Sequence, residues 1–352
     1  MVGEDRWTAA AARNNARNEP RMTTETVPVV SVVVPMLNEA GYILDCLEGF
    51  AGQAYPRDLL DVIVVDGGST DGSRSSVEQF CKSHPWCRVI DNPARKAAAA
   101  FNVGVEAARG KVLVLFSAHG EPDPEFIARS VHVLAETGVA GVGGHYIHEG
   151  TDPASSAVGL AMVSPFGMAS PHRSMRRRGE VDTISHPAYD VETLRSVGPF
   201  DENLERNSDY ELNYRMRRAG HVLLFDPSIV STYRPRASLR RLSRQFWWYG
   251  RWKERVVRQH PGSLKARHLV PPLAVLGLTT APILASRPLG RRVLLSVLGT
   301  YGIAVTAAMI HARPGEHGAS PTTLLVCFPV MHLSWGAGFL TSVIEDSLGT
   351  RK

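Results

Sequence analysis

Short runs of β-branched and aliphatic residues alternate with longer helical patterns over the first two thirds of the chain. The apolar runs fall at residues 29–35, 61–66, 87–91 and 111–117. Runs of this length, separated by segments with helical spacing, are typical of strands that are buried on both faces of a parallel sheet. The pattern predicts an α/β fold over residues 28–233, Rossmann-like, with a mostly parallel sheet and helices on both faces.

The pattern changes after residue 233, where long uncharged apolar stretches replace the alternation. They cover residues 269–286, 293–310 and 322–344. Each is close to the ~20 residues that cross the ~30 Å hydrocarbon core of a bilayer, and none has an amphipathic period. We predict a C-terminal α-helical transmembrane region over residues 268–345 with about three segments, the first kinked or re-entrant at its prolines. Buried core helices of a soluble domain are the alternative.

A strongly basic segment, residues 234–267, joins the two parts. It carries eleven Lys or Arg residues against the single acid Glu254, although the whole chain has a net charge of only +5. Leucines and aromatic residues recur at near-helical spacing among these cations, which is typical of a helix lying in the lipid headgroup layer. We predict a basic amphipathic interfacial helix that contacts membrane lipids and holds residues 28–233 on the cytoplasmic side. Nucleic acid is the alternative partner, but we expect none because no nucleic-acid module occurs in the chain.

The ends of the chain and its cysteines add two expectations. Residues 1–27 have no apolar period and predict a disordered tail, and residues 346–352 form a second short tail. The four cysteines, Cys46, Cys81, Cys87 and Cys327, have neither CxxC spacing nor a dense framework. We therefore expect a reducing compartment, with neither a zinc site nor a disulfide.

Polar clusters follow three of the predicted strands. Ligands of open parallel sheets bind at the carboxyl ends of the strands, and Asp66 closes one strand while His119 follows another. Carboxylates at 121, 123 and 125 accompany His119, and Mg²⁺ or Mn²⁺ takes few protein ligands when phosphate oxygens complete its shell. The cluster around His119 is compatible with a divalent cation bound beside a diphosphate. A tight structural turn after Asp66 and a histidine in a surface turn are the alternatives.

Five motifs occur in order along the chain: PMLNE, VVDGGSTDGS, FNVGVEAARGKVLVLFSAH, VGPFDENLERNSDYELNYRMRRAGHVLLFDP and RQFWWYGRWK. Over residues 29–345 they resemble the inverting family-two glycosyltransferases with the GT-A fold, and more narrowly the bacterial succinoglycan-type exopolysaccharide glucosyltransferase branch. The resemblance implies a membrane-bound enzyme that transfers a hexose, glucose from UDP-glucose, to a lipid-linked saccharide acceptor. It also implies a place in the bacterial inner (plasma) membrane, with the catalytic domain facing the cytoplasm.

The resemblance implies donor-side roles for residues near the strand ends. It assigns a first nucleotide-binding loop to Pro35, Asn38 and Glu39, recognition of the base to Asp66, and the diphosphate side to Asn102. The family's DxD metal motif falls on Ser117, Ala118 and His119. His119 is then the metal ligand, and Ser117 departs from the pattern because it replaces an acid.

The resemblance implies acceptor-side roles for residues later in the chain. Asp209 matches the second acid of the family's ED motif, the general base, with Ser208 in place of the first acid. Gln245, Arg251 and Trp252 resemble the QxxRW element, at longer spacing, and we interpret them as a gate and acceptor platform or as simple interfacial anchors. Residues 168–190 contain Arg173 and His186, which are candidate contacts to an acceptor phosphate or members of a solvated charge run.

Two other functions are compatible with the sequence. A polyprenyl-phosphate sugar synthase would use the same fold and donor with a bare lipid phosphate as acceptor. A non-catalytic membrane subunit that binds a sugar nucleotide would explain the serines at 117 and 208. Asp209→Asn separates an enzyme from such a subunit, since only an enzyme loses turnover when its base is removed.

Overall fold

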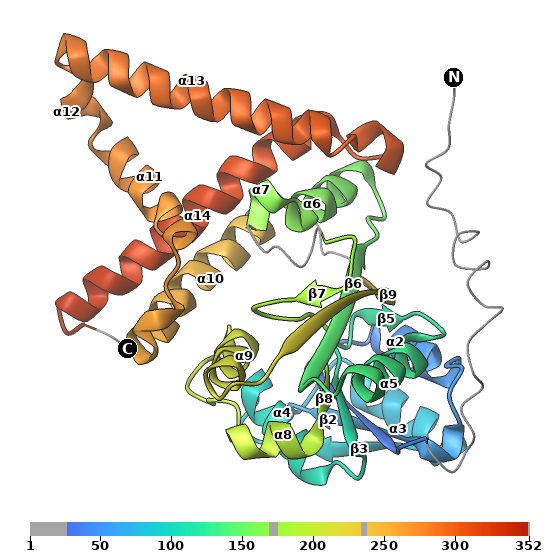
Figure 1. Ribbon diagram of the computed structural model, residues 1–352. Coiled ribbons are helices and arrows are strands. Elements are labelled where there is room, and N and C mark those ends of the chain that lie inside the picture. The colour runs from blue at the N-terminus through green and yellow to red at the C-terminus, as the bar shows by residue number, and fades with distance from the viewer. Residues whose placement is uncertain (1–26, 169–174, 234–237, 351–352) are drawn as a thin grey trace.

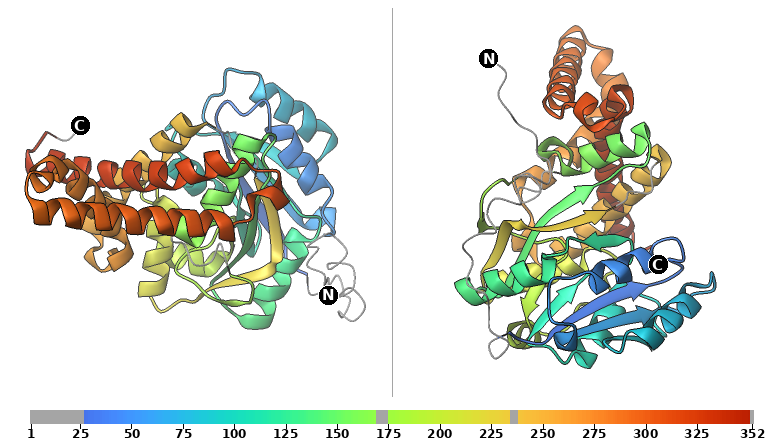
Figure 2. Two further views of the ribbon diagram at one scale, coloured as in Figure 1. Left: turned by 90° about the horizontal axis from the view of Figure 1, so that it is seen from above. Right: turned by 90° about the vertical axis from the view of Figure 1, so that its right-hand side faces the viewer.

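The computed structural model describes residues 27–168, 175–233 and 238–350 of the chain. A sheet flanked by helices forms one part, and the helices at the C-terminal end form a second part beside it (Figures 1 and 2). Two earlier helices, α6 (Pro153–Val163) and α7 (Pro165–Met168), pack against this second part through contacts with α14.

The sheet of the described residues has nine strands in the order β3-β2-β1-β4-β8-β6-β9-β5, with β7 paired to β9. Its strands are β1 (Val30–Met36), β2 (Leu60–Asp66), β3 (Cys87–Asp91), β4 (Val112–Leu115), β5 (Gly120–Pro122), β6 (Gly141–His148), β7 (Gly179–Glu180), β8 (Ala188–Asp190) and β9 (Leu223–Tyr233). β1 to β4 are mutually parallel, β6 is parallel to β9, and β5, β7 and β8 are antiparallel to their neighbours. All four strands predicted from the apolar runs are confirmed and are mutually parallel, whereas the sheet as a whole is mixed, with four parallel and four antiparallel strand pairs among the described residues.

Alternate residues of the central strands enter two separate cores. Val32 and Val34 of β1 pack on one side of the sheet, whereas Val33 packs on the other. The first side is covered by α2 (Ile43–Ala51), α3 (Ser73–Ser83) and α5 (Phe126–Thr137), and the second by α4 (Ala97–Ala107), α8 (Val191–Val197) and α9 (Ser208–Arg218). Because both faces are buried, the strands are apolar at nearly every position, which is why their sequences do not alternate.

The second part consists of α10 (Leu239–Gln259), α11 (Val270–Thr279), α12 (Ala281–Ala285), α13 (Pro288–His311) and α14 (Pro321–Ser347). Among the described residues, α13 and α14 are long and apolar enough to cross a membrane. The first predicted segment, 269–286, is instead divided into α11 and α12. The break lies beside Pro282, which lacks the N–H that an uninterrupted helix would use, so the structure has two such helices where the sequence predicted about three segments.

Single-turn helices complete the fold at η1 (Arg57–Leu59), η3 (Pro261–Ser263), η4 (Ala266–His268) and η5 (Pro314–His317).

The expectation of no disulfide is wrong: Cys81, near the end of α3, is bonded to Cys87, the first residue of β3. Cys46 and Cys327 are free and buried. The two bonded cysteines are only six residues apart and flank a turn, and CxxC spacing does not cover such a pair.

Candidate active site

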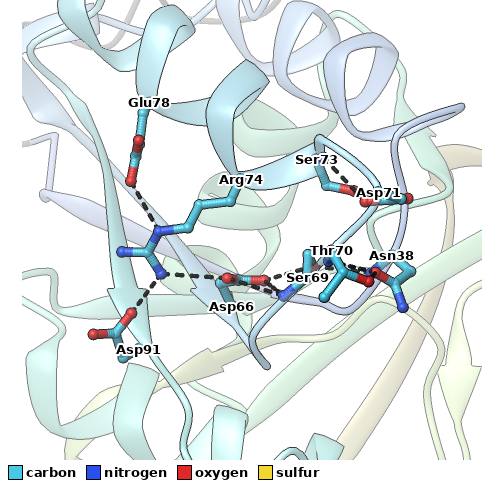
Figure 3. Close-up of polar contacts among 9 residues, drawn as sticks. All are labelled: Asn38, Asp66, Ser69, Thr70, Asp71, Ser73, Arg74, Glu78 and Asp91. Atoms are coloured by element: carbon cyan, nitrogen blue, oxygen red, sulfur yellow. Dashed lines mark hydrogen bonds and ion pairs between the residues drawn. The ribbon is translucent and has the colours of Figure 1, made fainter.

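The loops after β1 and β2 are joined by hydrogen bonds at the carboxyl edge of the sheet (Figure 3). The Asn38 side-chain oxygen accepts a bond of 2.8 Å from the backbone N–H of Thr70, and the Asn38 N–H donates to the Ser69 hydroxyl at 2.9 Å. Asn38 adopts a φ of 58°, a left-handed conformation that asparagine tolerates better than most residues. Bonds from Ser73 and from the N–H of Ala40, the latter at 3.0 Å, keep the pKa of Asp71 below its usual value. The two predicted nucleotide loops thus form one rigid rim.

Asp66 lies under this rim and is almost fully buried. Its carboxylate accepts bonds from the Ser69 hydroxyl at 2.6 Å and from the Ser69 N–H at 3.1 Å. Arg74, in the first turn of α3, reaches Asp66 at 3.3 Å and also pairs with Glu78 at 2.8 Å and Asp91 at 2.5 Å (Figure 3). These bonds, led by the one to Asp91, raise the pKa of the Arg74 guanidinium. The carboxylate that the sequence assigned to base recognition is therefore fixed in orientation and charge-balanced.

His119 follows β4 and faces the first loop. Its Nδ1 is buried and makes no hydrogen bond within the described part of the chain, and it lies 3.7 Å from Glu39 Oε1. A small pocket beside it is lined by Tyr42, Asp45, His119, Gly120, Glu121 and Thr232. Among the described residues, no three His, Cys, Asp or Glu side chains are close enough together to hold a metal ion by themselves. The pair of His119 and Glu39 nevertheless fits a divalent cation that takes its remaining ligands from a diphosphate.

Ser117, the first residue of the altered metal motif, is hydrogen-bonded to His186. The Ser117 hydroxyl lies 3.0 Å from His186 Nε2, while His186 Nδ1 lies 2.9 Å from the Ser231 hydroxyl. His186 has a φ of 42° and its ring packs on Phe116 with centroids 3.9 Å apart. The structure therefore places His186, predicted on the acceptor side, against the first position of the altered metal motif.

Asp209 is the second residue of α9 and is exposed at the helix N-terminus. Burial, and then the negative charge of Asp209, raise the pKa of Tyr189. Tyr189 donates a bond of 2.6 Å to Asn213 in the same helix as Asp209. A helix N-terminus stabilises a carboxylate, and exposure leaves Asp209 accessible to an incoming hydroxyl group.

The remaining donor-side residues have other surroundings. Pro35 lies in β1 opposite Val65, and Ala118 is buried. The Asn102 side chain donates to the carbonyl of Phe200 at 3.0 Å and accepts from its N–H at 2.8 Å. Asn102 thus ties α4 to the loop before α9.

The three residues predicted as a gate lie on α10. Gln245 donates to the Tyr249 hydroxyl at 2.8 Å, Arg251 forms a two-pronged ion pair with Glu345 of α14, and Trp252 is buried beside Leu204. Arg251 and Trp252 thus contact other parts of the protein, which favours the interpretation of these residues as structural anchors over a gate. Arg173 lies outside the described residues.

Sequence reasoning missed three partners of the predicted residues: Arg74, Ser231 and Glu345. Arg74 follows Asp66 by one short loop, so its position at the end of DGGSTDGSR offered a local signal. Ser231 and Glu345 are distant in sequence from His186 and Arg251, and no local pattern marks them.

Comparison with known proteins gives a consistent result. The family model described as Glycosyl transferase family 2 matches residues 31–195. The Succinoglycan biosynthesis protein ExoA of Rhizobium meliloti is 28% identical over 317 residues, 89% of this chain and 94% of that protein. The Dolichyl N-acetyl-alpha-D-glucosaminyl phosphate 3-beta-D-2,3-diacetamido-2,3-dideoxy-beta-D-glucuronosyltransferase of Methanococcus voltae is 28% identical over 239 residues, 65% of this chain and 74% of that protein.

A solved structure shares the fold over nearly the whole chain. It is the mannosyltransferase PcManGT from Pyrobaculum calidifontis in complex with GDP-Man and Mn²⁺, with a TM-score of 0.58 and 20% identity, covering 95% of this chain and 92% of that one. The shared fold is the GT-A fold predicted from the motifs. The Glycosyltransferase AglE of Haloferax volcanii is 30% identical over 225 residues, 63% of this chain and 72% of that protein. Together with the family model and the ordered motifs at the sheet edge, this match identifies the chain as a glycosyltransferase that belongs to family 2.

Proposed function

We propose that the protein transfers a hexose, glucose from UDP-glucose, with inversion onto a lipid-linked saccharide in exopolysaccharide or cell-surface glycan synthesis. The observation that carries the proposal is the gathering of Asn38, Glu39, Asp66 and His119 at the carboxyl ends of β1, β2 and β4. These residues lie at the strand ends where ligands of parallel sheets bind, which supports donor binding at this edge. The names of its relatives supply the glycan and lipid-linked classes.

Asp209 acts as the general base in this proposal. An acceptor hydroxyl is a poor nucleophile, so a carboxylate within about 3 Å takes its proton as the oxygen attacks the anomeric carbon. The anomeric bond to the diphosphate breaks on the opposite side, and a single attack of this kind inverts the configuration. Asp209 is exposed at the start of α9, where the helix dipole favours the ionised carboxylate that can accept the proton.

A divalent cation, Mg²⁺ or Mn²⁺, would neutralise the charge on the leaving nucleoside diphosphate. His119 and Glu39 would hold it, because the Nδ1 of His119 is buried, has no hydrogen bond within the described residues and faces Glu39. Ser117, bonded to His186, keeps the first position of the motif neutral. The mannosyltransferase with the same fold forms a complex with Mn²⁺, which supports this assignment.

The C-terminal helices anchor the enzyme in the bacterial inner membrane, with the catalytic part on the cytoplasmic side. α11, α12 and α13 expose large apolar side chains almost continuously, including Val270, Leu273, Ile283, Leu295 and Ile303. An exposed apolar surface this large and continuous favours contact with lipid over contact with water. The same placement brings Asp209 near a lipid-linked acceptor.

The test is a donor screen with the full chain in detergent. It measures the release of nucleoside diphosphate from UDP-sugars and GDP-sugars. Asp209→Asn should lower kcat by about 10²-fold or more with donor binding retained. Glu205→Gln, an exposed carboxylate four residues earlier, is the matched control and should change kcat less than about 2-fold. Equal activity of the two variants would refute the role of Asp209. A panel with a bare lipid phosphate and a lipid-diphosphate saccharide separates the sugar synthase from the proposed transferase.

A further inference from the structure

Four basic side chains lie around one carboxylate, and three of them pair with it, where α9 approaches the chain between α10 and α11. We call this cluster the basic junction, and it consists of Asp182, Arg217, Lys253, Lys265 and Arg267. Asp182 pairs with Arg217 at 3.2 Å and Arg267 at 3.7 Å, and also with Lys265. Burial raises the pKa of Asp182, but the bond and charge of Lys265 and the neighbouring arginines outweigh it and keep the pKa below its usual value. The carboxylate is therefore ionised and shared by several cations.

Lys253 pairs with no carboxylate among the described residues. It is 5% exposed, donates to the carbonyl of Ser263 at 3.2 Å, and lies 3.8 Å from the centre of the Tyr210 ring. Burial, and then the charges of Arg267 and Lys265, lower the pKa of Lys253 to about 7. A buried ammonium group is costly unless an anion compensates it. The junction thus has more positive charge than Asp182 can balance.

The junction is open on one side and borders apolar surface. The side chains of Arg217, Arg267 and Lys265 are 27%, 30% and 37% exposed. Three residues beyond Arg267, α11 begins with Val270, 65% exposed, and Leu273 follows at 61%. Figure 1 shows α11 beginning beside α14, after the segment that connects it to α10, and running toward α12, away from the sheet. A ligand here can place an anionic group on the cations and an apolar chain along α11.

We propose that the basic junction binds the phosphate group of a lipid phosphate, with the lipid chain lying against α11. Two sources supply this chemistry: the diphosphate of the lipid-linked acceptor, or the headgroup of an anionic bilayer lipid. The first source rests on the proposed function, because it assigns the acceptor's diphosphate to this junction. Arginine and lysine bind phosphate through charge-assisted hydrogen bonds, and the adjacent apolar helix distinguishes a lipid from free phosphate.

The test measures binding of farnesyl diphosphate to the full chain in an uncharged detergent. Lys265→Gln/Arg267→Gln should weaken binding about 10-fold or more, since two charge-assisted bonds are lost. Arg240→Gln/Arg241→Gln removes the same charge from the exposed start of α10 and should weaken it less than about 2-fold. Equal loss in both double variants would overturn the proposal, as would inorganic phosphate binding to wild type as tightly as farnesyl diphosphate.

Asp182→Asn provides a test in the opposite direction, which misfolding cannot imitate. It removes the internal anion that competes for the same cations, so the affinity for farnesyl diphosphate should rise about 3-fold or more. An unchanged or reduced affinity in a folded variant would contradict the proposal. Binding of the protein to phosphatidylcholine nanodiscs, with and without phosphatidylglycerol, separates the two sources of the phosphate. If phosphatidylglycerol strengthens binding and the double variant of the junction loses this gain, the ligand is a lipid headgroup. If phosphatidylglycerol gives no gain, the ligand is the diphosphate of the acceptor. UDP binding, measured in parallel, tests the proposed transferase independently of the junction.

Discussion

Replacement of Gly338 by alanine should force α10 and α14 apart. The two helices run in the same direction, since Ser243 bonds to Ser334 and, further along both helices, Arg258 pairs with Asp346. A Cβ at Gly338 would lie 1.9 Å from the carbonyl oxygen of Trp247 and 2.8 Å from its carbon. Both are backbone atoms, so no side-chain rotation can relieve the contact.

The size of the effect follows from this distance. Real Cβ contacts stay above 3.0 Å, so the helices must separate locally by about 1 Å. A gap of that size forfeits a quarter to a half of the dispersion energy of the contacts it opens, and overpacking usually costs about 1–3 kcal/mol. Because α10 and α14 pack over most of their shared length, we expect Gly338→Ala to lower the free energy of unfolding by about 2–3 kcal/mol.

Gly299→Ala in α13 is the matched control. Nothing lies within 4 Å of its Cβ position, and alanine is a better helix former than glycine by about 1 kcal/mol. Tryptophan fluorescence during denaturation in detergent reports the right interface, because Trp247, Trp248 and Trp252 lie on α10 and Trp335 on α14. Gly338→Ala should unfold earlier than wild type, and Gly299→Ala should not. Equal unfolding of the two variants would refute the close helix contact.

Three further predictions concern charge. Lys253 has a pKa of about 7 in the folded protein, below its usual value, so above pH 7 the unfolded chain binds more protons than the folded chain. The free energy of unfolding should therefore rise by up to about 1.4 kcal/mol per pH unit from pH 7 to 9. Lys253→Met should remove that slope. Arg251→Gln and Glu345→Gln, with side chains 11% and 30% exposed in wild type, should show a coupling of about 1–2 kcal/mol in a double-mutant cycle, and additive losses would contradict the pair. EDTA should stop sugar transfer, and added Mn²⁺ should restore it. His119→Gln should raise the Mn²⁺ concentration needed for transfer about 10-fold or more. An unchanged Mn²⁺ requirement in this variant would exclude His119 as a ligand.

The parts of the molecule that could be predicted depend on local patterns. Four strands could be predicted from their apolar runs, because burial on both faces requires an apolar residue at nearly every position of the strand. The meeting of Asn38 with the loop after Asp66 followed from the rule that parallel strands end at one edge. Both arguments need only neighbouring residues and the direction of the strands.

The parts that could not be predicted depend on tertiary contacts between distant segments. Ser117 and His186 are 69 residues apart, and Arg251 and Glu345 are 94 apart. The motif around Arg251 predicts either a gate and acceptor platform or an interfacial anchor, and it does not reveal the ion pair with Glu345, which forms because α14 packs along α10. Proline at 282 did signal a break, but whether a helix bends or stops there depends on what packs against it.

Because α10 also contacts α9, the predicted clash at Gly338 should affect catalysis as well as stability. On one side α10 contacts α14, and on the other it holds the α9 segment: the Tyr249 carbonyl accepts a bond from Asn207, and Lys253 lies on the Tyr210 ring. Asn207 and Tyr210 flank Asp209 within α9 and its cap. A shift of α10 by about 1 Å is therefore transmitted to the proposed base, and a misplacement of that size can cost about 10²-fold in rate. Donor binding, which depends on the edge of β1 and β2, should survive the same change, so Gly338→Ala should lower kcat more than donor affinity.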